Sequence, residues 1–233
     1  MILTLIVLGV FLVDWLAVGY SWRKLEQVMK PLAMIMVIVW TLNQSGWDYS
    51  AVLIILLLAQ VFGLAGDVFL LLQSRWFLHG LGAFLLGHLF YGGLAAWFLL
   101  NAYTPTSLLV WEAFVAVGIW AFTLLSFYGF VAPKSPRLTM PKSLWVPIQM
   151  YGWVLSVLVL LSVLVFFTAS DQINTLVFLP VGAVLFYVSD SLLAFDRFKR
   201  KLPRIRVWIM VTYHLAQLSL AWGFLASFGY GSG

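Results

Sequence analysis

The 233-residue chain has no cysteine and very little charge. Without cysteine it can form no disulfide, no thiolate metal site and no cysteine nucleophile. Charged residues make up 9% of the chain, against about 25% in an ordinary soluble domain, whereas 64% of the residues are hydrophobic. So few charges cannot cover the surface of a soluble protein of this size. The composition therefore excludes a soluble globular enzyme, a disordered chain and a nucleic-acid-binding protein.

Long apolar stretches are present instead, and a membrane-spanning helix needs about 20 mostly apolar residues. Eight such stretches are separated by short polar or Pro- and Gly-containing breaks, at about 2–20, 31–43, 51–72, 77–100, 108–130, 144–168, 174–195 and 206–228. Pro31 is suited to the first position of the second helix. The sequence therefore predicts an all-α fold, a polytopic bundle of eight transmembrane helices that forms a single integral membrane domain over residues 1–233.

Lys and Arg occur only in every second break. All 13 lie in the breaks at 21–30, 73–76, 131–143 and 196–206, and none lies at 44–50, 101–107 or 169–173. Basic residues mark cytoplasmic loops, so both termini are predicted to be extracytoplasmic. The expected location is a membrane, the cytoplasmic membrane if the source is bacterial. The densest basic cluster, at 197–206, either determines this topology or contacts anionic lipid headgroups or a phosphate-bearing substrate.

Ionisable groups at membrane depth are costly and are candidates for a functional site by default. They are Asp14, Asp67, His88, Glu112, Asp190 and His214. All except Glu112 lie in the half of the membrane nearer the basic breaks. Asp67 and Asp190 are about 8–9 Å from the ends of their spans, at 1.5 Å per residue. The pattern predicts one polar site built from several helices.

Helical spacing adds neighbours to these groups, because residues three or four apart share a face. Tyr91 lies beside His88, and Gln217 lies beside both Tyr213 and His214. A zinc site drawing on His88, His214 and an Asp is conceivable, but no two of these ligands share a helix at i, i+4 spacing. We predict no metal and no other cofactor.

Two further features each have two interpretations. Ser189 and Ser191 flank Asp190, and hydrogen bonding to the backbone or to the carboxylate fits them better than a nucleophilic role, because no adjacent base is present. The span at 77–100 has five glycines, which permit either tight helix packing or space for a lipid chain. They are Gly80, Gly82, Gly87, Gly92 and Gly93.

Four segments resemble the YhhN family of multi-pass membrane proteins, which includes the lysoplasmalogenases. They are GDVFLL at 66–71, FLLGHLFY at 84–91, PVGAVLFYVSDSLLA at 180–194 and YHLAQ at 213–217. The resemblance implies an eight-span helical fold and a lysophospholipid substrate, a lysoplasmalogen whose vinyl ether bond is hydrolysed. The products would be a fatty aldehyde and a glycerophospho-alcohol. Asp67 and Asp190 match the two aspartate motifs of the family.

This chemistry suits two buried carboxyl groups, one acting as an acid and the other stabilising an oxocarbenium ion and activating water. The predicted catalytic residues are Asp67, Asp190, His88 and Tyr91, and either Asp can be the acid. The predicted substrate-binding residues are Ser189, Tyr213, Gln217, Asp14 and His214. A proton-coupled small-molecule transporter and a zinc-dependent intramembrane lipid hydrolase are the alternatives, because buried Asp and His serve these classes too.

Overall fold

The computed structural model describes residues 2–72, 74–102, 109–131, 142–168, 176–199 and 201–230. Within these ranges eight helices are long and apolar enough to cross a membrane, which confirms the predicted all-α bundle. They are α1 (Ile2–Gly19), α2 (Arg23–Gln44), α3 (Ala51–Leu71), α4 (Phe77–Ala102), α5 (Val110–Val131), α6 (Lys142–Thr168), α8 (Phe178–Phe198) and α9 (Ile205–Ser227), with a short 3-10 helix η1 (Ser74–Trp76) before α4. The predicted break at 169–173 and most of the predicted breaks at 101–107 and 131–143 lie outside the described residues.

The predicted start of the second span at Pro31 is wrong, because α2 begins at Arg23 and contains Pro31 in its interior. The prediction followed the apolar run, which stops at charged residues. The helix continues through them because Glu26 pairs with Arg206 and Lys30 pairs with Asp67, so that their charges are matched inside the bundle. Lys30 therefore points into the protein from a helix, and does not lie in a surface loop.

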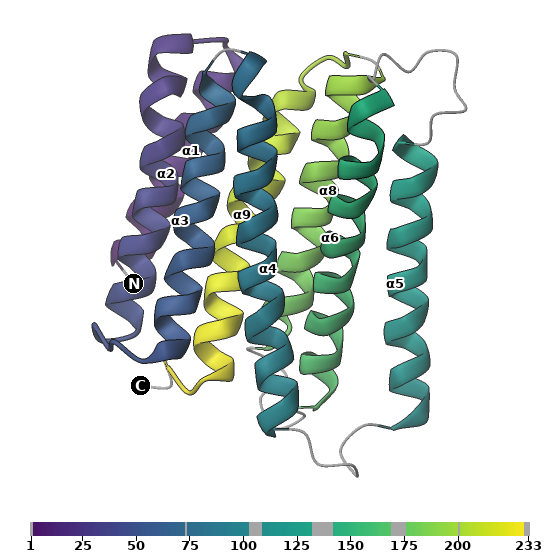
Figure 1. Ribbon diagram of the computed structural model, residues 1–233. Helices are drawn as coiled ribbons and strands as arrows, with labels where there is room; N and C mark the ends of the chain where they lie inside the picture. The colour runs from purple at the N-terminus through teal and green to yellow at the C-terminus, as the bar shows by residue number, and fades with distance from the viewer. Residues whose placement is uncertain are drawn as a thin grey trace.

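Helix α9 is the centre of the bundle and α5 is its edge (Figure 1). Helix α9 packs against α1, α2, α3, α4 and α8, whereas α5 contacts α6 and α8. Most of α9 is buried within the protein, and most of α5 faces outward. Helices α3, α4, α8 and α9, which carry most of the predicted site residues, therefore lie around one shared interior.

Glycines allow two pairs of these helices to approach closely. A side chain at Gly182 of α8 would place its Cβ 2.8 Å from the backbone nitrogen of Leu220 in α9, and Gly223 of α9 has the same relation to the backbone of Leu179. Between α3 and α4, a Cβ at Gly87 would lie 3.0 Å from the carbonyl oxygen of Ala59. These positions are closed to larger residues because backbone cannot move aside locally.

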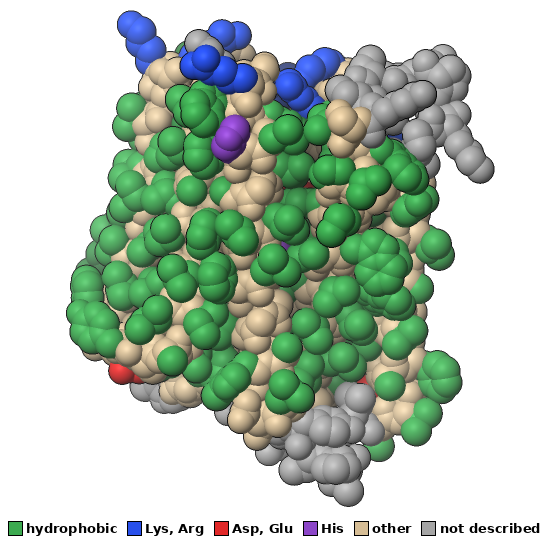
Figure 2. All heavy atoms as spheres, viewed as in Figure 1, with side chains coloured by type: hydrophobic (Ala, Val, Ile, Leu, Met, Phe, Trp, Pro, Cys, Tyr) green, Lys and Arg blue, Asp and Glu red, His purple; other side chains and the backbone are tan. Residues whose placement is uncertain are grey.

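Charge is concentrated at one end of the bundle. Hydrophobic side chains cover the flank in Figure 2, and Lys and Arg gather at the end where α1 meets α2, α3 meets α4 and α8 meets α9. Both termini lie toward the other end. There the Tyr230 hydroxyl donates a hydrogen bond to Asp48, and this bond lowers the pKa of the Asp48 carboxyl group. The same hydroxyl lies 2.9 Å from Ser50 Oγ. The arrangement agrees with the predicted alternation of loops, and the cytoplasmic placement of the basic end stays a prediction.

Single-cysteine variants can test this orientation without background, because the chain has no cysteine. We expect a membrane-impermeant maleimide to label Tyr49→Cys on intact cells and Ser74→Cys only after permeabilisation, since the basic end should face the cytoplasm. Both residues are exposed and lie at opposite ends of α3. The reverse labelling pattern would show that the orientation is inverted.

Alanine substitutions at two glycines should change stability in opposite directions. Gly182→Ala forces a Cβ against the backbone of α9, and such overpacking costs about 1–3 kcal/mol. Gly118→Ala on α5 meets nothing within 4 Å and should stabilise its helix by up to about 1 kcal/mol. Thermal unfolding of the purified variants measures both. Equal Tm values for the two variants would contradict the close α8–α9 packing.

Candidate active site

Asp190 of α8 is the centre of one buried cluster. Its carboxylate accepts a hydrogen bond from the Tyr151 hydroxyl of α6. His88 Nε2 of α4 lies 3.6 Å from the same oxygen, Asp190 Oδ2. The imidazole is held edge-on against the rings of Tyr151 and Phe186, with centroid distances of 5.4 and 4.4 Å. Three helices therefore bring together His88 and Asp190, both of them predicted site residues.

Asp67 of α3 is the centre of a second cluster. Lys30 Nζ of α2 lies 3.3 Å from Asp67 Oδ1, and the two side chains are 6% and 1% exposed. The Tyr213 hydroxyl of α9 also interacts with the Asp67 carboxylate. One turn before Asp67, the missing side chain of Gly63 leaves room for α9, since a Cβ there would lie 2.7 Å from Gln217 Nε2. A carboxylate and an ammonium thus form an ion pair within the bundle.

A chain of hydrogen bonds lies next to the Asp67 carboxylate, inside the bundle. Tyr91 of α4 donates to Gln217 Oε1 at 2.6 Å, and Gln217 Nε2 donates to the Tyr213 hydroxyl at 3.3 Å. Because Tyr213 accepts this bond, its own hydrogen is available to Asp67. Tyr91, Tyr213 and Gln217 therefore belong to the Asp67 cluster, although Tyr91 shares a helix face with His88.

The two carboxyl groups have different partners. No hydrogen bond joins Asp67 to Asp190 in the part of the chain that the structure describes, but the two are close enough to interact electrostatically. Asp67 faces an ammonium group, whereas Asp190 faces a phenol and an imidazole. Two chemically distinct carboxyl groups within one interior can perform acid–base work on a molecule placed between them.

Asp14 and His214 form a separate cluster between α1 and α9. His214 Nε2 is 4.0 Å from Asp14 Oδ2, and Trp15 Nε1 donates to His214 Nδ1 at 3.1 Å. Asp14 and His214 are both fully buried. Ser189, another predicted substrate-binding residue, donates to the Ile209 carbonyl at 3.1 Å and so links α8 to α9. The hydrogen bond of Ser189 favours a packing role for that residue.

Asp14 and His214 stay candidate site residues. Neither carboxyl oxygen of Asp14 has a hydrogen-bond partner among the described residues, and Asp14 also interacts electrostatically with Lys30 and Asp67.

Metal-ligand clusters are absent from the described ranges, where no three or more His, Asp and Glu residues lie close enough to hold an ion. His88 and His214, the histidines considered as zinc ligands, belong to different clusters. The zinc-hydrolase alternative therefore has no ligand set among the described residues.

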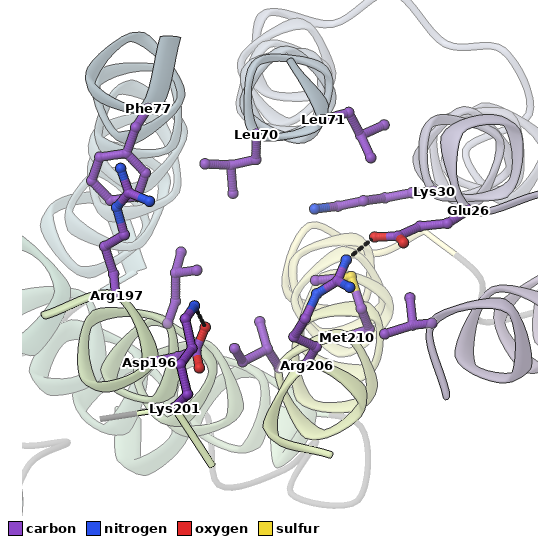
Figure 3. Close-up of a pocket in the computed structure, with 13 residues that line it drawn as sticks. Glu26, Lys30, Leu70, Leu71, Phe77, Asp196, Arg197, Lys201, Arg206 and Met210 are labelled. Atoms are coloured by element: carbon purple, nitrogen blue, oxygen red, sulfur yellow. Dashed lines mark hydrogen bonds and ion pairs between the residues drawn. The ribbon is translucent and has the colours of Figure 1, made fainter. Parts of the chain in front are cut away.

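A cavity of about 180 Å³ opens at the basic end of the bundle (Figure 3). Lys30 points into it, and Arg197, Lys201 and Arg206 line its walls. Glu26 orients Arg206, and Asp196 orients Lys201 at 2.7 Å. Lys30 lines this cavity and also pairs with Asp67. Glu26 and Asp196 line the cavity too, so an anionic group entering here would meet four cations, three of which are already paired with Glu26, Asp196 and Asp67.

A second, much smaller cavity of about 20 Å³ adjoins Asp190 and Tyr151. This volume accommodates about one water molecule. Phe77 and Leu193 line both cavities, so these two side chains separate the basic cavity from Asp190. The Arg197 guanidinium lies 4.8 Å from the centroid of the Phe77 ring, in cation–π contact.

Lys30 and Tyr151 are site residues that sequence reasoning missed. Lys30 was assigned to a cytoplasmic loop. A second helix that began before Lys30 would place it on one face with Met34 and Val37, which are both buried. Tyr151 lies within an apolar span, and nothing in its spacing distinguishes it from a tyrosine that packs in the core.

The fold and these clusters define a multi-pass helical membrane protein with two buried carboxyl groups beside a basic cavity. The chain belongs to the YhhN family, whose model matches residues 25–224, and this confirms the resemblance of the short segments. It is also similar to lysoplasmalogenase TMEM86B of Mus musculus, with 29% identity over 210 residues, which cover 88% of this chain and 77% of the mouse protein. No solved structure matches the chain.

The Lys30–Asp67 pair generates a stability prediction. Lys30→Met leaves the Asp67 charge buried without its partner, which typically costs about 3–5 kcal/mol. The double variant Lys30→Met/Asp67→Asn removes both charges and should recover most of this loss. Denaturant or thermal unfolding of purified protein measures the effect. Lys24→Met, at an exposed position of the same helix, is the matched control, and equal stability of the two single variants would count against the ion pair.

Proposed function

We propose that this chain hydrolyses the vinyl ether bond of lysoplasmalogens, with Asp190 as the acid and Asp67 as the negative charge that faces the cationic intermediate. The observation that carries the proposal is the pair of buried carboxyl groups with different partners beside a basic cavity. Membership of the YhhN family and similarity to a relative named as a lysoplasmalogenase support the same substrate class.

The reaction consumes one water molecule. The acid donates its proton to the β-carbon of the vinyl ether, the electrons of the double bond form the new C–H bond, and a lone pair of the ether oxygen forms the oxocarbenium ion. Water adds to the carbon bonded to oxygen and loses a proton to a carboxylate. The resulting hemiacetal then breaks its bond to the glycerol oxygen, which takes up a proton. The products are a fatty aldehyde and the glycerophospho-alcohol.

Asp190 is suited to be the acid because no ammonium or guanidinium group pairs with it among the described residues. Tyr151 fixes one carboxyl oxygen, and the small cavity beside both residues can hold the reacting water. His88 Nε2, at 3.6 Å from Asp190 Oδ2, lines an apolar groove between α4 and α6 and is placed to exchange a proton with Asp190 itself. General acid catalysis of this type contributes about 10²–10⁴-fold to a rate.

Asp67 is suited to the second role because Lys30 stabilises its ionised form. Lys30 also lines the basic cavity, so a bound phosphate would share the ammonium charge with Asp67 and leave more of the carboxylate charge for the oxocarbenium ion. Tyr213, held by Gln217 and Tyr91, lies beside the Asp67 carboxylate, and its hydroxyl hydrogen is available to it.

The distances along the helices fit a phosphate in the basic cavity and a vinyl ether between the carboxyl groups. Asp190 is seven residues from Arg197 in α8, or about 10 Å along the axis. Asp67 is four residues from Leu71, which also lines the cavity, or about 6 Å along α3. The three carbons of glycerol separate the phosphate from the vinyl ether in the substrate.

The reaction class can be tested with two lipids that differ by one double bond. Purified protein should release fatty aldehyde from a lysoplasmalogen and none from its saturated 1-O-alkyl analogue, because the analogue has no double bond to protonate. Release of product from both lipids would indicate a different hydrolysis, and release from neither would remove the proposed function.

The roles of the carboxyl groups predict the behaviour of two variants. Asp190→Asn and Asp67→Asn should each lower kcat by at least about 100-fold, because each removes a group that acts in the transition state. Glu112→Gln is the matched control, since Glu112 is on α5 and accepts a hydrogen bond from the Leu109 backbone. Aldehyde release measured on folded protein decides the matter, and activity within a few-fold of the wild type in either Asp variant would refute the mechanism.

A further inference from the structure

We propose that the groove between α4 and α6 binds the hydrocarbon chain of the lipid whose hydrolysis is proposed above. The groove has a volume of about 360 Å³ and an almost wholly apolar lining. Gly92, Gly93 and Ala96 form its α4 side, and Trp153 and Val157 are part of its α6 side. This inference rests on the proposed function and adds a chain-binding subsite to it.

Four of the five glycines of α4 divide into two groups; the fifth, Gly82, meets nothing within 4 Å and does not line the groove. Gly80 and Gly87 face α3, where an added Cβ would lie 3.3 Å from the carbonyl oxygen of Gly66 and 3.0 Å from that of Ala59. Helix packing therefore accounts for both of them. An added Cβ at Gly92 would have its nearest neighbour, Leu161, at 4.0 Å, and one at Gly93 would meet nothing within 4 Å. Packing does not require glycine at these two positions, where the missing side chains keep the groove open.

His88 joins this groove to the reactive centre. It lines the groove although the residue is only 1% exposed. Neither ring nitrogen makes a hydrogen bond of good geometry to the described residues, and Nε2 is directed toward Asp190 at 3.6 Å. A buried polar side chain whose nitrogens lack hydrogen-bond partners needs an explanation. At the inner wall of an apolar groove, His88 marks the point where the apolar part of a bound molecule ends and its reactive group begins.

The order of features along α4 matches the order of groups in a single-chain phospholipid. Phe77 lines the basic cavity, and His88 follows eleven residues later, about 16 Å along the axis. Gly92 and Ala96 are a further 6–12 Å along, at about 1.5 Å per residue. Phosphate, vinyl ether and hydrocarbon chain would therefore occupy the cavity, the carboxyl centre and the groove in sequence. The occupant is one hydrocarbon chain, because the proposed substrate carries a single chain and the groove lining beyond His88 is apolar.

A photoreactive lipid tests the subsite without any need for catalysis. The probe is a saturated 1-O-alkyl lysophospholipid with a diazirine near the end of its chain, added to the purified full-length protein. We expect labelling within residues 89–97 and 153–161, and competition by an unlabelled lysophospholipid but not by a diacyl phospholipid. Labelling of another face, or equal competition by the diacyl lipid as for bulk bilayer lipid, would overturn the proposal.

A matched pair of variants tests the groove itself. Gly93→Phe should reduce labelling and the kcat/KM for a long-chain lysoplasmalogen by about tenfold or more, equivalent to about 1.4 kcal/mol of lost binding, and should affect a short-chain analogue less. Gly118→Phe adds the same side chain to an exposed position of α5 and should change neither. Equal effects of the two variants would overturn the proposal. A change in oligomeric state caused only by Gly93→Phe would also overturn it, because that change would identify the groove as an interface between copies of the chain. If Gly93→Phe does not fold, the wild-type labelling map decides.

The two proposals fail in different ways. If the saturated lipid labels the groove but no lysoplasmalogen releases aldehyde, the chain-binding subsite is supported and the proposed reaction is refuted. Aldehyde release with labelling elsewhere would leave the reaction and remove the subsite.

Discussion

The ion pair between Lys30 and Asp67 is the constraint on which the rest of the interior depends. A charge at membrane depth is costly, and a buried pair is tolerated only when its geometry is good and further polar groups surround it. This requires α2 to stay helical back to Arg23, α3 to pack against it and Tyr213 of α9 to reach Asp67. Gly63 permits that approach of α9. One charge pair thus connects three helices, and its lysine also lines the basic cavity.

The sequence was sufficient for the fold because a helix is the simplest way to satisfy the backbone inside a membrane, and apolar length reveals such helices. It also made Asp67, His88 and Asp190 candidates for a site, since an ionisable group at membrane depth needs a reason to be there, and the structure buries all three and brings His88 beside Asp190. The sequence could not predict which side chains on different helices contact each other, because spacing along one helix shows only which of its residues share a face. Tyr91 was therefore grouped with His88 but bonds to Gln217. Lys30 was missed for the same reason, since hydropathy counts a lysine as polar whether or not a carboxylate lies opposite it.

The extent of the family match helps to rank the two sets of buried ionisable groups. The match begins at residue 25, so it includes Lys30, Asp67 and Asp190 together with their tyrosine partners. Asp14 precedes it, and its partner His214 is held by Trp15, which also lies outside the matched region. A cluster that is half outside the family region and lines none of the described cavities ranks lower as the reactive centre. A cluster that is wholly inside the family region and adjoins a cavity is better explained as a site.

The proposed hydrolysis of a single-chain lipid gives one water-soluble product and one apolar product. The placement of the two cavities is suited to releasing them in different directions. The basic cavity lies at the charged end of the bundle, where a glycerophospho-alcohol can leave toward water. The groove between α4 and α6 is apolar and lies farther along α4, where a fatty aldehyde can leave into the bilayer. The carboxyl groups lie between these two openings and are nearly closed to both. In the proposed reaction, protonation of the vinyl ether in such a place would keep water scarce until the oxocarbenium ion forms, and the cavity beside Asp190, with room for about one molecule, would then supply the water that is consumed.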